Sequence, residues 1–346
     1  MRRGMPRAMC ASELAARRLP VNGLVVAASA AGPSRALLAT ALLLAGCSHD
    51  LARSRDILFV AQRPGGTEDT YALHLADLTT RRLIKADSAT SRSLPAWSPD
   101  TRSIAFIREF DDRSQLYVLD SVGGTPRQLA ASLDKFLAWP DWSPDGASIL
   151  FTGGSPDHRA AVYVIHSDGS GLRRILPDSI SLRCPSWAPD GHQFTVSAYR
   201  AGRSSILAVD LDSGAPRTLL ASDSTFLDCP QWSPKGEAIV LTIVSGSTAI
   251  WEVDPLEAWR SRLGILDLKS GQLRLVVDGP GLNDYGHWSR DGHWIVFQSN
   301  RHAAPHVDSL RLRDRFGSLE IYVVRADGSD LRRLTRNAYF DGHPSW

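Results

Sequence analysis

The sequence predicts an all-β fold, a β-propeller of six blades with four antiparallel strands in each blade. Six tryptophans, at positions 97, 142, 187, 232, 288 and 346, are separated by 45, 45, 45, 56 and 58 residues and lie in similar contexts such as Pro140-Asp-Trp-Ser-Pro-Asp-Gly146. An apolar, β-prone run begins seven residues after each of the first five tryptophans, as in Ile149-Leu-Phe151. One unit of four short strands every ~40 to 45 residues is the spacing of a propeller blade.

Each repeat reads as four strands in a fixed order, which the second repeat illustrates. A first strand ends at Trp142, and the turn at 143–146 leads to the second strand at 149–151. In that turn proline fixes φ and glycine accepts a positive φ. A third strand follows at 162–165, and the arginine-bearing fourth strand lies at 173–175. Equivalent runs recur along the chain, so each complete repeat supplies one blade.

The two ends of the chain complete a further blade between them. Pro344-Ser-Trp346 is a first strand with nothing after it, whereas 57–59, 71–73 and 81–83 are three strands with no first strand before them. We therefore expect the C-terminal strand to pair with the N-terminal three strands and to close the ring. Closure removes two open sheet edges, which otherwise invite aggregation.

Composition and charge are those of an ordinary soluble globular protein. Apolar residues make up 43% and charged residues 22% of the chain. The net charge of +2 comes from the first 46 residues, which carry six arginines and one glutamate; the rest holds 33 basic and 36 acidic residues. Nucleic acid binding needs a basic face, so we do not expect a nucleic-acid partner.

Residues 1–46 have the features of an export signal. Arg35 precedes an apolar run of about a dozen residues, shorter than the ~20 that a membrane-spanning helix needs but suited to the core of a signal peptide. Leu44-Ala-Gly-Cys47 resembles a bacterial lipobox, which implies that Cys47 is acylated and becomes the N-terminus. A plain signal peptide with an incidental cysteine is the alternative. We expect a signal peptide over 1–46, a short tether over 47–53 and the propeller over 54–346.

The repeats resemble those of the TolB family of propellers. The resemblance lies in Pro-x-Trp-Ser-Pro-Asp-Gly, in strands such as Ile321-Tyr-Val323 and in Arg332-Arg-Leu-Thr335, and it covers roughly residues 53 to 346. It implies an envelope protein that binds a partner, as TolB binds outer-membrane lipoproteins. TolB carries an α/β domain before its propeller and is ordinarily soluble in the periplasm. Similar repeats form the propellers of dipeptidyl-peptidase-IV-like and prolyl-oligopeptidase-like enzymes, but no hydrolase domain is recognised in these residues.

Alignment of the repeats places a polar position directly before each tryptophan. It holds Ala96, Asp141, Ser186, Gln231, His287 and Ser345. Innermost strands line the central channel, so Asp141, Gln231 and His287 are candidates to face it. The alternative is that they only make structural hydrogen bonds beside channel water.

Aromatic and charged residues precede the innermost strands and are expected around one mouth of the channel. Phe136, Phe226 and Phe340 lie six residues before their tryptophans; nearby are Tyr285, Tyr339, Lys135, Arg183, Asp228, Asp284 and Asp341. Such a rim suits recognition of a partner or a peptide, although the phenylalanines are also consistent with simple capping of the blades. The extra residues of the fourth and fifth repeats, at 245–261 and 301–318, are expected at the same mouth.

The position three residues before each tryptophan is mostly apolar. It holds Leu94, Trp139, Cys184, Cys229, Tyr285 and His343. We therefore interpret Cys184 and Cys229 as small buried hydrophobic residues. A disulfide needs Cα atoms within about 7 Å, which is closer than we expect for neighbouring blades.

Catalytic and metal chemistry have little support in the sequence. His302 and His306 lie in a proline-containing loop that does not align them as zinc ligands. There is no Gly-x-Ser-x-Gly elbow for a nucleophilic serine. A histidine cluster of the kind used by propeller lyases remains an alternative, drawn from His287, His293, His343, Asp284 and Asp341.

We expect a monomeric, non-catalytic envelope protein without cofactor or metal. It would face the periplasm, and Ser48 after the acylated Cys47 resembles the signal for sorting to the outer membrane. One propeller face would bind an envelope protein or a peptidoglycan-associated lipoprotein. The alternative function is a lyase or hydrolase acting on a carbohydrate or peptide at the channel mouth.

Overall fold

The computed structural model describes residue 51 and residues 56–62, 68–86, 94–110, 113–120, 124–133, 135–154, 159–245, 260–302, 319–337 and 339–346. The expected signal peptide, Cys47 and most of the tether lie outside the described residues, as do 246–259 and 303–318 of the two insertions. Within the residues that the structure describes, no helix is long and apolar enough to cross a membrane.

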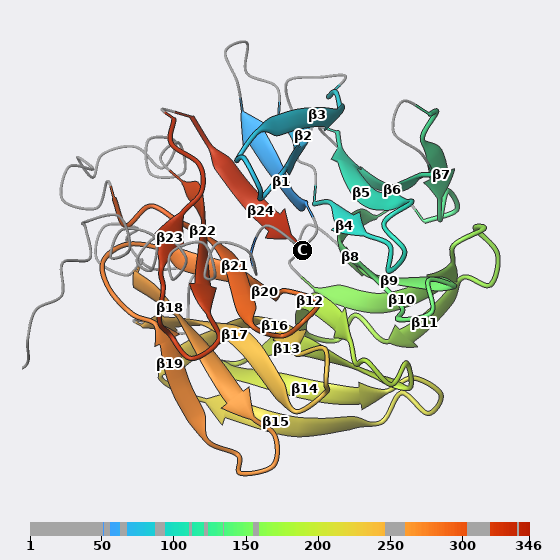
Figure 1. Cartoon of the computed structure of the whole chain (residues 1–346). Helices are drawn as coiled ribbons and strands as arrows, with labels where there is room; N and C mark the ends of the chain where they lie inside the picture. Colours follow the sequence, from blue (N-terminus) through green and yellow to red (C-terminus); the bar gives the residue numbers. More distant parts are fainter. Residues whose placement is uncertain are drawn as a thin grey trace, which may run out of the picture. The chain divides into compact units, whose positions relative to one another are not determined.

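The described strands form six four-stranded antiparallel sheets around a central axis (Figure 1). They are blades 1 to 6, numbered in the order of their tryptophans. Blade 1 contains β4 (Ala96–Trp97), β5 (Ile104–Glu109), β6 (Ser114–Leu119) and β7 (Arg127–Leu129). Blade 2 contains β8 (Phe136–Trp142), β9 (Ser148–Gly154), β10 (Ala160–His166) and β11 (Arg173–Leu176). Blade 3 contains β12 (Ser181–Trp187), β13 (Gln193–Arg200), β14 (Arg203–Asp210) and β15 (Pro216–Ser222).

The remaining three blades follow the same order of strands, and the last is shared by the two ends of the described chain. Blade 4 contains β16 (Thr225–Trp232), β17 (Ala238–Ser245), β18 (Arg260–Asp267) and β19 (Leu273–Val277). Blade 5 contains β20 (Asn283–Trp288), β21 (Trp294–Ser299), β22 (Glu320–Arg325) and β23 (Arg332–Arg333). Blade 6 contains β24 (Asp341–Ser345), β1 (Ile57–Gln62), β2 (Glu68–Leu73) and β3 (Thr80–Ile84). The two insertions therefore lie in the β17–β18 and β21–β22 connections.

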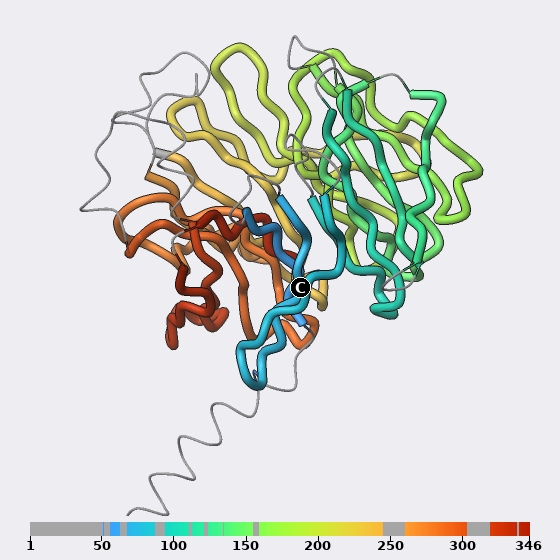
Figure 2. The backbone as a smooth tube through the Cα atoms, turned by 90° about the horizontal axis from the view of Figure 1, so that it is seen from above, coloured from blue at the N-terminus to red at the C-terminus, as the bar shows by residue number. Residues whose placement is uncertain are grey.

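The ring closes as the sequence predicts. Strand β24 pairs antiparallel with β1, with Leu58 opposite Ser345 and Ala61 opposite Asp341. Figure 2 shows the same closure from a direction 90° away, with the end of the chain beside the blue first strands. The prediction of six blades and of a blade shared by both ends is confirmed.

The hydrophobic core lies between neighbouring blades. Each of the six buried clusters in the described chain draws its residues from two adjacent blades. Between blades 1 and 2, for example, Ile107 and Leu116 pack with Leu137 and Phe151. Burying one such side chain stabilises a fold by roughly 1.5–3 kcal/mol. The second strands are nearly continuous apolar runs, and successive side chains serve the interfaces on the two sides of a blade: Ile57 and Phe59 belong to one cluster and Leu58 to the other.

The tryptophan and the turn after it connect and shape the blades. The indole N–H of Trp142 donates to the carbonyl of Ala96 in the preceding blade, at 3.1 Å. In the following turn the hydroxyl of Ser143 donates to Asp145, at 2.6 Å, and Gly146 has φ +72°. In blade 1 Thr101 takes the glycine's place and has φ +62°. This is an uncommon conformation for a β-branched residue.

Arginines of the outermost strands form a further link between blades. Arg127 donates to the carbonyl of Ser167 at 2.8 Å, and Arg274 donates to that of Ala326 at 2.6 Å. Each carbonyl belongs to a turn of the next blade. These side chains therefore tie neighbouring blades together at the perimeter.

Candidate functional site

A backbone bulge recurs in the innermost strands and decides which side chains reach the channel. The register shifts between Ala138 and Asp141 in β8, and equivalent shifts occur in β12, β16 and β20. The residue three before the tryptophan has a left-handed φ between +45° and +54° in five blades, namely Trp139, Cys184, Cys229, Tyr285 and His343. A bulge changes the direction in which a side chain points. These five residues line a common cavity on the channel axis.

The axial cavity is small, and a larger funnel adjoins it. The axial cavity has a volume of about 50 Å³, and its lining also includes Gln231 and His287. The funnel has a volume of about 340 Å³ and is lined by residues of blades 1, 2 and 3 together with Tyr285 and His343. Its aromatic and charged lining residues are Phe136, Trp139, Tyr285, His343, Glu109, Arg159 and Arg183. Leu94, Trp139, Tyr285 and His343 line both spaces, so they lie between the funnel and the axial cavity.

A largely buried ion pair adjoins the funnel, because its cation Arg183 lines that space. Nη2 of Arg183 in β12 is 3.1 Å from Oδ2 of Asp228 in β16, and the two side chains are 19% and 11% exposed. The guanidinium of Arg183 also lies 4.8 Å from the centre of the Trp139 ring. Burial alone would lower the pKa of Arg183, but the negative charge of Asp228 and the hydrogen bonds with Asp228 and Tyr285 outweigh it, so the pKa is raised. Arg183 therefore stays a cation between two blades.

Tyr285 stands beside this ion pair. Burial raises the pKa of its hydroxyl to about 12, although the positive charge of Arg183 acts in the opposite direction. Its ring meets that of His343 edge to face, with 4.8 Å between the ring centres. The hydroxyl remains neutral over the physiological range, so Tyr285 offers the funnel an aromatic face and a hydrogen-bonding group.

Burial shifts the pKa values of Asp284 and His287 toward their neutral forms. Burial, reinforced by the charge of Asp228, raises the pKa of the Asp284 carboxyl to about 7. Oδ1 of Asp284 has no hydrogen-bond partner among the described residues. Burial lowers the pKa of His287 to about 4, so its imidazole carries no charge at neutral pH. Asp284 does not line the funnel or the axial cavity.

Asp141 and Gln231 connect neighbouring blades. Oδ2 of Asp141 accepts the backbone N–H of Trp187 at 2.7 Å. Burial raises the pKa of the Asp141 carboxyl to about 7, against the effect of that hydrogen bond. Oε1 of Gln231 accepts the hydroxyl of Ser186 at 3.1 Å. Asp141 therefore makes a hydrogen bond between blades and does not line the axial cavity. Gln231 makes such a hydrogen bond and also lines the axial cavity.

The three phenylalanines occupy different environments. Phe136 is half-buried and lines the funnel. Phe226 is buried and packs against Tyr199, with 5.9 Å between the ring centres. Phe340 lies 5.9 Å from the ring of His343. The expected aromatic rim is therefore brought together only in part, around Phe136, Trp139, Tyr285, His343 and Phe340.

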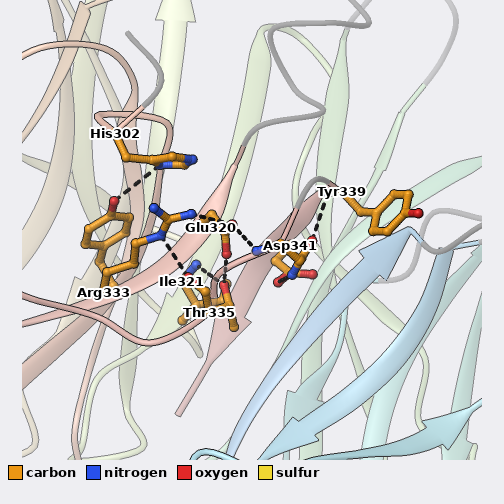
Figure 3. Close-up of polar contacts among 9 residues, drawn as sticks. His302, Glu320, Ile321, Arg333, Thr335, Tyr339 and Asp341 are labelled. Atoms are coloured by element: carbon orange, nitrogen blue, oxygen red, sulfur yellow. Dashed lines mark hydrogen bonds and ion pairs between the residues drawn. The ribbon is translucent and has the colours of Figure 1, made fainter.

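Asp341 belongs to a network that holds the closing strand (Figure 3). The fully buried carboxylate of Glu320 accepts hydrogen bonds from Arg333 and from the backbone N–H of Asn337, both at 2.7 Å, and from the hydroxyl of Thr335. The side chain of Asn337 donates to Asp341 at 2.6 Å. This network fixes the segment that leads into β24. No pattern in the sequence predicts this network, because Glu320 directly precedes an apolar strand at the end of an insertion.

The expectation that Cys184 and Cys229 are free buried residues is wrong. They form a disulfide whose Cα atoms are 4.8 Å apart. The expectation assumed that equivalent Cα atoms of neighbouring blades lie farther apart than the ~7 Å that a disulfide permits. The bulge instead turns the side chains of both residues toward the axis, where neighbouring blades come closest. The positions of Arg183 and Asp228 before their tryptophans also could not show that the two side chains form an ion pair.

A family model and several known proteins match this chain. Residues 52–258 match the family described as TolB beta propeller domain. A 79-residue stretch is 35% identical to an uncharacterised protein of Agrobacterium fabrum and covers 23% of this chain and 22% of that protein. TolB from Acinetobacter baumannii superposes with a TM-score of 0.65 at 20% identity, over 84% of this chain and 66% of that chain. A TolB-type protein of Agrobacterium tumefaciens has a TM-score of 0.60 at 21% identity, over 83% and 89%. The chain thus spans just under two thirds of the A. baumannii TolB.

Proposed function

The chain belongs to the family of TolB β-propeller domains, and from that premise we propose that it is a binding protein of the bacterial cell envelope whose funnel receives a segment of a partner protein. In this proposal the partner is an envelope protein or a peptidoglycan-associated lipoprotein. An acyl chain on Cys47 would hold the propeller at the membrane, facing the periplasm.

The funnel is the observation that carries this proposal. A concave site of about 340 Å³ at one end of the channel is within the size range of ligand pockets. Phe136, Trp139 and Tyr285 offer apolar ring surface, and Arg159 and Arg183 offer hydrogen-bond donors. Aromatic residues and arginine are the side chains that most often dominate binding energy at protein interfaces. An extended peptide with one apolar side chain and free backbone carbonyls would match this lining.

The residues considered for catalysis have contacts that favour binding over a reaction. Asp341 is bound by Asn337, and Asp284 lies outside the lining of both cavities. His287 lines only the axial cavity, and burial keeps its imidazole neutral with a pKa of about 4. A general acid and base need to reach one substrate together, and these groups do not share a surface of the funnel.

Crosslinking in the envelope, followed by mass spectrometry, tests this function. The test variant is Phe136→Ala combined with Arg159→Glu, which changes the apolar and the charged lining of the funnel. The control is Arg217→Glu, which reverses a charge on the exposed outer strand β15. We expect a specific crosslinked protein with the unchanged chain and the control but not with the double variant. The same crosslinked proteins from all three chains would contradict the proposal.

A further inference from the structure

Two sulfur atoms and a carboxylate come together at the axis, beside the cavity. Sγ of Cys184, Sγ of Cys229 and a carboxylate oxygen of Asp228 all lie within 4.8 Å of one another, and all three residues are buried. Oδ1 of Asp228 is 4.0 Å from Sγ of Cys184, while Oδ2 is held by Arg183 at 3.1 Å. One carboxylate oxygen therefore faces the sulfurs, and the other is fixed from behind.

We propose that Cys184, Cys229 and Asp228 form a Zn²⁺ site once the disulfide is reduced. Zn²⁺ binds thiolates and carboxylates in a tetrahedral arrangement, with Zn–S distances of about 2.3 Å and Zn–O distances of about 2.0–2.2 Å. This geometry separates the two sulfurs by roughly 3.7 Å, so reduction must let them move apart from their bonded distance. Arg183 acts as the outer partner that orients a ligating carboxylate.

The charges of the site balance when the metal is bound. Two thiolates and the carboxylate carry three negative charges, and Zn²⁺ and Arg183 carry three positive charges. An uncompensated buried charge is costly, so the Arg183–Asp228 pair favours a divalent cation with two thiolates. The carboxylate favours Zn²⁺ over Cu⁺, which selects thiolates and thioethers.

The cavities provide a path for the metal. Cys184 and Cys229 line the axial cavity, which shares Trp139, Tyr285 and His343 with the funnel. An ion that enters the funnel would pass these side chains and Leu94, which also lines both spaces. The fourth coordination position belongs to water in the axial cavity, as is usual for a site with three protein ligands.

The reaction requires an external dithiol as the reductant. Its two electrons and two protons convert the Cys184–Cys229 disulfide to two thiols, and the dithiol is oxidised to its own disulfide. Zn²⁺ then displaces both thiol protons and forms two Zn–S bonds, so each bound ion releases two protons.

Titration with Zn²⁺ tests the proposal. The full chain is titrated once in its oxidised form and once after reduction, with the reductant removed before Zn²⁺ is added. We expect one tightly bound ion, with release of two protons, for the reduced chain and none for the oxidised chain. Asp228→Asn should weaken binding at least tenfold. The control is Asp223→Asn, which removes the carboxylate of an exposed pair with Arg203 and should leave binding unchanged.

Two outcomes would overturn the zinc site. One is equal Zn²⁺ binding by the oxidised and reduced unchanged chain, a comparison that needs no variant to fold. The other is a reduced chain that loses its near-ultraviolet circular dichroism and does not regain it with Zn²⁺. The proposal does not depend on whether the funnel binds a peptide, because binding of Zn²⁺ alone is measured.

Discussion

Replacement of Asp284 by asparagine should remove part of the dependence of stability on pH. Burial and the charge of Asp228 raise the folded-state pKa of Asp284 to about 7 from its ordinary value of 3.8, while the hydrogen bond with Gln298 and the charge of Arg183 act in the opposite direction. Between these two values the folded chain keeps a proton that the unfolded chain has lost. The contribution of Asp284 to stability is therefore present at low pH and is lost as the pH rises toward 7.

The magnitude follows from this difference in proton binding. Each pH unit in the window changes the free energy of unfolding by about 1.4 kcal/mol, so the whole window accounts for at most about 4 kcal/mol. Asp141 acts in the same direction, since burial also raises its pKa to about 7. His287 acts in the opposite direction below pH 6.5, because burial lowers its pKa to about 4. Comparison of Asp284→Asn with the unchanged chain cancels both contributions.

Urea unfolding followed by circular dichroism between pH 5 and pH 8 measures the effect. Relative to the unchanged chain, Asp284→Asn should gain stability by about 1.4 kcal/mol per pH unit up to pH 7 and then level off. Asp100→Asn is the control: hydrogen bonds with Ser98 lower the pKa of that carboxyl, so it is ionised in both states throughout this range. Parallel pH profiles for Asp284→Asn and the unchanged chain would refute the reasoning.

Three further predictions concern the stability of the ring. Replacing Cys184 and Cys229 by serine should lower the free energy of unfolding by about 4 kcal/mol, because the disulfide closes a loop across a sequence separation of 45 residues. Chemical denaturation of this variant and of the oxidised unchanged chain measures the difference, and equal midpoints would contradict the prediction. A chain ending at Asp341 should lose on the order of 5 kcal/mol through the missing pairing with β1, and an unchanged melting curve would argue against closure. Glu320→Gln should lower the free energy of unfolding by about 3 kcal/mol, since it leaves Arg333 without its charged partner; thermal melting measures the effect, and an unchanged melting temperature would contradict the prediction.

The architecture could be predicted because it depends on features that repeat in the sequence. The tryptophan at position 142 and its equivalents set the phase of every blade, and Gly146 marks the turn that follows. Trp346 identified the closing strand for the same reason. Each of these residues acts through its own local structure or through contacts with the neighbouring blade, so the spacing along the chain was sufficient.

The candidate site was less predictable because it depends on the bulge. Four residue types with little in common, tryptophan, cysteine, tyrosine and histidine, adopt the same left-handed φ before Pro140, Pro185, Pro230, Gly286 and Pro344. The residue before a proline normally favours an extended conformation, so local rules indicate the opposite backbone. The disulfide and the Arg183–Asp228 pair both follow from this geometry and could not be seen without it.

A photocrosslinking amino acid placed in the funnel tests the binding role most directly. In the cells that produce the protein, the probe would replace Phe136, which lines the funnel, or Arg217, which lies on the exposed outer strand of blade 3. The funnel proposal predicts one specific envelope protein crosslinked from position 136 and not from position 217. No crosslinked protein from position 136, or the same protein from both positions, would contradict it.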